Sequence, residues 1–136
     1  SGRHVSCANL LGMCLNATVY KYYGRRTPME ARTWAARQQL FRAYFEQVAA
    51  DIVCIQEASA DSFEDDFGFM RELGYDHELH RKFRFRSATF WRRDKFQLQA
   101  TAHKDRTLIT ALQGPPPPLL VHHHTPLSLL GLRLQL

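Results

Sequence analysis

The sequence predicts a single domain of the α+β class, and two observations lead to this prediction. Residues 51–57 contain four consecutive apolar residues rich in β-branched types, which is typical of a strand buried on both faces. Residues 34–48 carry aromatic side chains at helical spacing with charged residues between them, as in an amphipathic helix. The length of 136 residues suits one globular domain and leaves no room for two ordinary ones.

The first strand is expected to end at Asn9, because residues 5–10 alternate as a strand covered on both sides would. A capping box from Thr27 to Glu30, with Pro28 at the first helical position, predicts the start of the first helix. The stripe expected to face the core of this helix is Trp34, Phe41, Tyr44, Phe45 and Val48.

A second helix is predicted between Ser62, as its cap, and Gly74, which ends it. Residues 75–79 alternate as an edge strand would. Residues 87–91 and 96–100 are expected to form a hairpin, and residues 107–112 a further strand.

Residues 114–136 are predicted to be a disordered tail rich in Pro, His and Leu, so the domain itself would comprise residues 1–113. Prolines 115–118 lack the amide donors that a central strand needs. The first residue is not Met, and all 13 acidic residues lie between Glu30 and Asp105. This distribution predicts that one or both ends are incomplete or altered.

Basic residues are concentrated in residues 81–106, which hold nine Lys and Arg against two Asp. This pattern favours a polyanionic partner such as nucleic acid, while a solvated basic face is the alternative. No run of about 20 apolar residues exists, so no membrane span is predicted. Nothing in the sequence indicates an oligomeric state.

The three cysteines share no C-x-x-C spacing, which favours reduced thiols and a reducing compartment, the cytoplasm or nucleus. Cys54 is expected to be an inert core thiol. His103 is expected to be a solvated turn residue. The histidines at 122–124 are expected to bind metal only weakly and adventitiously, because they lack fixed geometry.

Asn9 and Glu57 are predicted to stand at the carboxyl ends of neighbouring strands, where ligands collect in α/β sheets. A carboxylate beside an amide oxygen is the kind of oxygen site that Mg²⁺ prefers. The alternative is structural: Glu57 would cap the following turn, and Asn9 would bond to a loop backbone.

Residues 51–57 (DIVCIQE) resemble the D-hydrophobic-hydrophobic-C-hydrophobic-Q-E strand of the endonuclease/exonuclease/phosphatase superfamily, which has the DNase I-like fold. The resemblance is greatest to the deadenylase-like branch that contains carbon catabolite repressor 4, nocturnin and the angel proteins. It extends over about residues 5–112. The supporting segments are 5–11 (VSCANLL), 34–37 (WAAR), 73–75 (LGY) and 88–96 (ATFWRRDKF).

The resemblance implies part of a four-layer α/β sandwich and Mg²⁺-dependent phosphodiester hydrolysis, with Mn²⁺ as the alternative ion. RNA, degraded from its 3′ end, is the implied substrate. Glu57 would be the metal-binding catalytic glutamate, and Asn9 would help to hold the metal and the scissile phosphate. Arg84 and Arg86 would line the approach of the RNA backbone. Phe83 and Phe85 would stack on bases, with hairpin packing as the alternative.

The later motifs of this family, N-T-H-L, a G-D-F-N-like loop and S-D-H, are absent in recognisable form. Where N-T-H-L is expected, residues 120–127 place His124 near the histidine position, and Pro126 argues against an intact strand. We therefore expect an N-terminal part of such a domain, altered after Gln113, with little or no activity. A non-catalytic nucleic-acid-binding module and a small-molecule phosphatase of the same superfamily are the other hypotheses.

Overall fold

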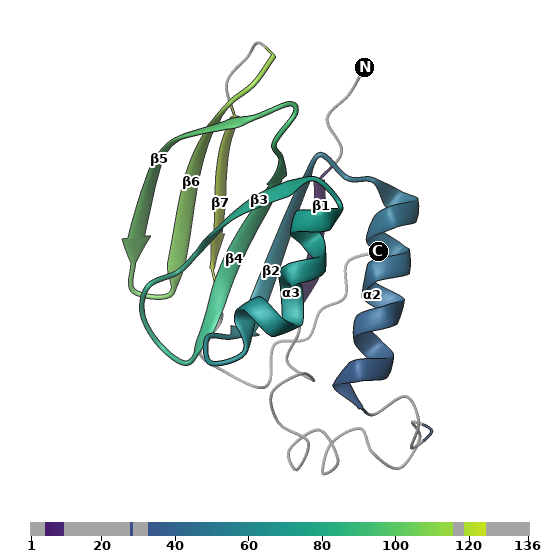
Figure 1. Cartoon of the computed structure of the whole chain (residues 1–136). Helices are drawn as coiled ribbons and strands as arrows, with labels where there is room; N and C mark the ends of the chain where they lie inside the picture. The colour runs from purple at the N-terminus through teal and green to yellow at the C-terminus, as the bar shows by residue number, and fades with distance from the viewer. Residues whose placement is uncertain (1–4, 10–27, 29–32, 116–118, 125–136) are drawn as a thin grey trace.

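The computed structural model describes residues 5–9, 28, 33–115 and 119–124, which form helices and strands in mixed order (Figure 1). The elements are β1 (Val5–Asn9), α2 (Trp34–Val48), β2 (Ile52–Ser59), α3 (Phe63–Glu72), β3 (Tyr75–Leu79), β4 (Phe85–Arg92), β5 (Gln97–Lys104), β6 (Thr107–Gln113) and β7 (Leu119–His124).

The strands form two sheets. The first sheet has the order β1-β2-β4-β3, with β1 parallel to β2 and the other pairs antiparallel. The second sheet is antiparallel, with the order β5-β6-β7. Helices α2 and α3 lie on one side of the first sheet, and the second sheet lies on the other side (Figure 1). The predicted α+β class is therefore confirmed, and the chain also contributes strands to a second sheet.

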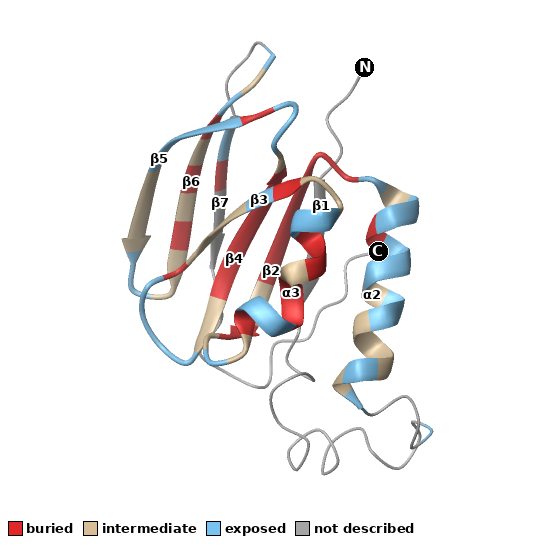
Figure 2. Cartoon of the chain, in the orientation of Figure 1, coloured by how far each residue is buried: buried red, intermediate tan, exposed pale blue. Residues whose placement is uncertain are grey.

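Strand β2 is buried on both faces, as its apolar run predicts (Figure 2). Val53 and Ile55 belong to the core between the first sheet and the helices. Ile52 and Cys54 belong to a second core between the two sheets. Cys54 is buried in this second core, in agreement with the predicted structural role.

Helix α2 begins later than the capping box predicts. Pro28 is not helical, and the helix begins at Trp34 with Thr33 as its N-cap, whose hydroxyl accepts a hydrogen bond from the Ala36 amide at 3.3 Å. Thr27 and Glu30 lie outside the described residues. Most of the predicted stripe packs on the core, but Tyr44 is 48% exposed. The core-facing stripe is therefore narrower than predicted.

Helix α3 agrees with the prediction at both ends. Ser62 occupies the N-cap position, but its side chain makes no capping hydrogen bond and its hydroxyl donates to Asp66 Oδ2 at 2.6 Å instead. Gly74 follows it with a φ of 89°, a left-handed conformation that glycine adopts without strain. Strand β3 then forms an edge of the first sheet, as its alternation predicts.

The predicted hairpin between residues 87–91 and 96–100 is wrong. Strand β4 pairs with β2 and β3 in the first sheet, whereas β5 pairs with β6 in the second. Both edges of β4 are thus occupied, so no edge remains for β5. Phe96, 4% exposed, lies in the core between the sheets and anchors the chain where it crosses from one sheet to the other.

The predicted tail is partly wrong as well. Residues 119–124 form β7, which pairs antiparallel with β6, and Val121 is 9% exposed in the core between the sheets. The prolines precede this strand, so their missing amides remove no donor from its ladder. The argument from the prolines against a strand therefore fails. Residues 125–136 lie outside the described part of the chain.

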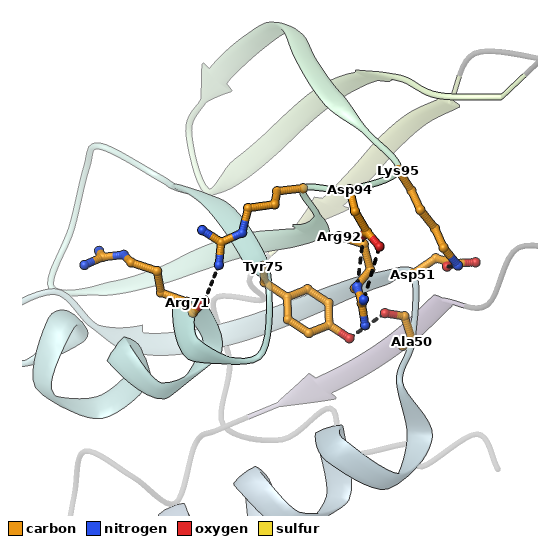
Figure 3. A network of polar contacts seen from close by, with 8 residues as sticks. Ala50, Asp51, Arg71, Tyr75, Arg92, Asp94 and Lys95 are labelled. Atoms are coloured by element: carbon orange, nitrogen blue, oxygen red, sulfur yellow. Dashed lines mark hydrogen bonds and ion pairs between the residues drawn. The ribbon is translucent and has the colours of Figure 1, made fainter.

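Polar contacts tie together the amino-terminal end of β2 and its surroundings (Figure 3). The Tyr75 hydroxyl donates to the Ala50 carbonyl, and Lys95 Nζ lies 2.6 Å from Asp51 Oδ1. The Arg92 guanidinium lies over the Tyr75 ring at 5.7 Å and pairs with Asp94. We call Ala50, Asp51, Tyr75, Arg92, Asp94 and Lys95 the amino-end network.

Candidate functional site

The parallel pair of β1 and β2 determines where the two predicted site residues lie. Its register places Asn9 opposite Gln56, and Glu57 follows Gln56 directly. The backbones of Asn9 and Glu57 therefore lie at the same carboxyl edge of the first sheet, as the order of elements predicts. The side chain of Asn9 lies outside the described part of the structure. The metal and catalytic roles of both residues remain predictions.

Glu57 has an unusual backbone conformation. The register between β2 and β4 shifts between Ile55 and Ala58, and Glu57, within this irregularity, has a φ of 61°. Non-glycine residues rarely adopt this conformation, which costs about 1–3 kcal/mol. Bulges that re-aim a side chain are over-represented beside active sites. The prediction placed the end of this strand at Glu57. In the structure, the strand bulges at Glu57 and continues to Ser59.

Burial and one nearby cation act in opposite directions on Glu57. Burial raises the pKa of this carboxyl, and the charge of Arg106 partly offsets the rise. Arg106 lies in the turn between β5 and β6, so the second sheet contributes to the surroundings of Glu57. A half-buried carboxylate with a raised pKa is typical of functional positions.

The two predicted nucleic-acid-binding arginines lie in different surroundings. Arg84 precedes β4, is 67% exposed at its side chain, and pairs with Asp61 at 3.2 Å. Arg86 lies within β4, and its Nε donates to the Phe83 carbonyl. The Arg84 guanidinium also lies 5.6 Å from the Phe85 ring centroid. Arg84 therefore remains exposed to solvent, whereas Arg86 stabilises the loop that precedes β4.

Phe83 lies in that loop, with a φ of 72° and 45% of its surface exposed. The guanidinium of Arg106 lies 4.6 Å from the centroid of its ring. The ring of His80, itself only 1% exposed, lies nearly parallel to it at 6.3 Å. Sequence reasoning missed Arg106, because only the contact between the sheets brings it to Phe83. It also missed His80, which precedes Phe83 in the same loop, because no pattern marks their rings as neighbours. The only sequence pattern that included Arg106 was the concentration of basic residues in residues 81–106.

The expectation that His103 is a solvated turn residue is wrong. His103 lies in β5 with 10% of its side chain exposed, and its Nε2 lies 3.2 Å from Glu78 Oε1. Its ring meets that of His80 edge-on at 5.2 Å. Burial lowers the pKa of His103, and Arg81 lowers it further while Glu78 opposes the change. Among the described residues, His80 Nε2 and His103 Nδ1 are buried without a hydrogen-bond partner.

The described residues contain no group of three or more His, Cys, Asp and Glu side chains arranged to hold a metal ion. Mg²⁺ retains several waters and often takes one or two protein oxygens together with substrate phosphate. Glu57 fits such a site, because its half-buried carboxylate would gain from a nearby cation.

No family model matches the chain. Solved structures do match its fold. The structure of ANGEL2, a 2′,3′-cyclic phosphatase, superimposes with a TM-score of 0.73 at 21% identity, over 88% of this chain and 39% of that one. D. rerio TDP2 with a single-strand DNA product matches at a TM-score of 0.62 and 12% identity, over 88% of this chain and 44% of that one.

The human nocturnin catalytic domain matches at a TM-score of 0.54 and 19% identity, over 66% of this chain and 41% of that one. The chain thus spans about 40% of the length of these structures. In the described part of the chain, the helices are too short or too polar to cross a membrane. The predicted fold is confirmed: the chain has part of the DNase I-like fold, which it shares with the ANGEL2 and nocturnin structures and with a bacterial structure from the endonuclease/exonuclease/phosphatase family.

Proposed function

We propose that this chain carries the Glu57 portion of a metal-dependent phosphodiesterase site that acts on nucleic acid, above all RNA. The observation that carries the proposal is the half-buried Glu57 carboxylate, held in a strained bulge at the edge of β2 beside Asn9. The fold supports it, because ANGEL2 is a 2′,3′-cyclic phosphatase and TDP2 was solved with a DNA product.

Each residue has a defined task in this proposal. Glu57 and Asn9 would hold Mg²⁺, or Mn²⁺ in its place. When bound, the ion would polarise a phosphoryl oxygen of the substrate. The bulge would fix the direction of the Glu57 carboxylate before the substrate arrives, which lowers the cost of ordering the site. Arg84 and Arg86 would hold backbone phosphates and align the strand.

We expect the chain to bind metal and nucleic acid with little or no turnover. The general base and its acidic partner belong to the N-T-H-L, G-D-F-N and S-D-H motifs, which the sequence lacks in recognisable form. We place the chain in a reducing compartment, the cytoplasm or nucleus, because its three cysteines share no C-x-x-C spacing.

The first test is titration with Mn²⁺, observed by water proton relaxation, on the chain and on Glu57→Gln. Weak binding by the chain should be lost in this variant, because the amide keeps the shape of the side chain but removes its charge. The matched control is Glu46→Gln, an exposed glutamate of α2 that pairs with Arg42. Equal Mn²⁺ binding by the chain and Glu57→Gln would contradict the assignment of the metal site.

The second test incubates poly(A) RNA with Mg²⁺ and either the chain or Glu57→Ala. Little degradation is expected in both. Robust cleavage that Glu57→Ala abolishes would disprove the low turnover and would support the site. A panel of RNA, DNA, inositol phosphates and dinucleotides would reveal a small-molecule phosphatase instead.

A nucleic-acid-binding module without catalysis is the second candidate. The specific observation in its favour is the exposure of Arg84 and Phe83 on the loop before β4. Salt-dependent RNA binding that is unchanged by Glu57→Gln and by removal of divalent metal would favour this candidate.

A further inference from the structure

The loop between β3 and β4 presents an aromatic ring to solvent at the cost of backbone strain. Phe83 is 45% exposed and has a φ of 72°, which is unusual for a bulky side chain. Three contacts keep this conformation: Arg86 Nε donates to the Phe83 carbonyl, the Lys82 amide donates to His80 Nδ1 at 3.1 Å, and the His80 ring lies parallel to the Phe83 ring. Beside these contacts 45% of the residue remains exposed, and a strained backbone that presents an aromatic ring to solvent suggests a ligand.

Arg106 connects this ring to the candidate site. Its guanidinium lies 4.6 Å from the Phe83 ring centroid, and its charge also acts on the Glu57 carboxylate. The β3–β4 loop therefore contributes an aromatic surface, Phe83. The β5–β6 turn contributes a cation, Arg106, and the β2 bulge contributes a carboxylate, Glu57. These three groups match the base, the phosphate and the metal site that a nucleotide would contact.

Building on the proposed function, we infer that Phe83 and Arg106 form a nucleotide clamp: a base packs against the exposed part of the Phe83 ring, and Arg106, which rests on that ring, contacts the phosphate that leads to Glu57. The occupant is single-stranded nucleic acid, because bases inside a duplex have both faces covered by their neighbours. The loop charge agrees, since residues 81–86 contain four Lys or Arg and no acidic residue. Stacking tolerates every base, so the clamp confers preference for single strands without base specificity.

The test compares two labelled oligonucleotides of equal length by fluorescence anisotropy: a single-stranded A-rich RNA and an abasic backbone. Divalent metal is removed with EDTA, so the result does not depend on the metal site. Phe83→Asn should weaken RNA binding about 5-fold or more and leave binding of the abasic strand unchanged, and Phe83→Tyr should retain RNA binding. The matched control is Tyr44→Asn, which removes an exposed aromatic from α2.

Phe83→Asn is chosen because asparagine tolerates positive φ, so this variant should unfold at the same urea concentration as the chain or a higher one. Arg106→Met should weaken binding of both oligonucleotides and reduce the slope of log affinity against log salt by about one.

The outcomes separate the clamp from the proposed function. If the chain binds RNA and Phe83→Asn binds it equally well, the clamp is wrong and the proposed function stands. If the chain binds neither oligonucleotide at low salt, both the clamp and a nucleic-acid substrate are wrong. The Mn²⁺ titration of Glu57→Gln tests the metal site independently of either result.

Discussion

The two ends of the first sheet differ in how their polar groups and backbone are arranged. At the amino end of β2, the amino-end network gives Tyr75, Asp51 and Lys95 short polar contacts (Figure 3). At the carboxyl end, Glu57 and Phe83 have positive φ. Nearby, His80 Nε2 has no hydrogen-bond partner among the described residues.

This difference indicates that the two ends of the first sheet have different roles. Contacts that stabilise the fold gather at the amino end, where the positive φ of Ala49 belongs to the C-cap of α2. The carboxyl end instead combines the strained Glu57 and Phe83 with exposed functional groups. Such strain persists only where the surrounding structure holds it, and it costs stability that other regions must supply. Substitutions at the two ends should therefore change stability in opposite directions.

The largest effect is expected at the amino end from Tyr75→Phe. This variant removes the hydrogen bond to the Ala50 carbonyl, and Ala50 is fully buried, so the carbonyl would lose its partner. The free energy of unfolding should fall by about 1–3 kcal/mol. Urea denaturation measures the loss, and Tyr44→Phe on the exposed side of α2 is the control. An unchanged midpoint would show that the hydrogen bond from the Tyr75 hydroxyl contributes nothing to stability.

The next effect is expected from Lys95→Met. Asp51 keeps only 12% of its side chain exposed, and Lys95 pairs with it at 2.6 Å. Because the Lys95 side chain is half exposed, solvent screens the pair, and the loss should be about 1 kcal/mol or less. Thermal unfolding of Lys95→Met beside Lys104→Met would measure it. A larger loss of stability in Lys104→Met than in Lys95→Met would contradict the importance assigned to Lys95.

A smaller effect concerns pH. Burial lowers the pKa of His103 and of His77 below the usual value of about 6.5, so the unfolded chain binds their protons more readily. The stability associated with the neutral imidazoles is present above about pH 6.5 and is lost as the pH falls toward their pKa values in the folded chain. Urea midpoints from pH 7.5 to 5.5 should decline less in His103→Gln than in the chain. A parallel decline would exclude His103 as a source of the pH dependence.

The smallest effect, and one of opposite sign, is expected from Glu57→Gln. Burial raises the pKa of Glu57, so its charged form costs stability at neutral pH, and the cost disappears below about pH 4.5, where the unfolded carboxyl is also protonated. The neutral variant should be more stable by about 0.5 kcal/mol at pH 7, with the gain vanishing at low pH. Differential scanning calorimetry at the two pH values measures it. Destabilisation at pH 7 would mean that the Glu57 charge supports the fold.

Local patterns predicted the part of the molecule around Glu57 well. The apolar run of β2 and the polar pair that follows it indicate a buried strand with a carboxylate at its edge, and β1 pairs beside it as expected. The bulge at Glu57 was not predictable, because it depends on pairing with β4.

Features that depend on distant contacts escaped prediction. Strands β4 and β5 look like a hairpin until β2 and β3 occupy both edges of β4. The surroundings of Phe83 depend on Arg106 from the second sheet, and no spacing in the sequence joins them. Strand β7 was not predicted, because four prolines precede it; their missing amides disfavour a strand in the proline run itself but not in the residues that follow.

The burial of β2 on both faces has a consequence for how securely Glu57 is placed. Val53 and Ile55 fill one core while Ile52 and Cys54 fill the other. Sliding β2 by one residue would exchange these two sets and misfit both cores at once, since neighbouring strand residues point to opposite faces. The register of the strand is thus fixed by both cores, and a one-residue deletion within β2 before the bulge would turn the Glu57 carboxylate away from the edge it occupies.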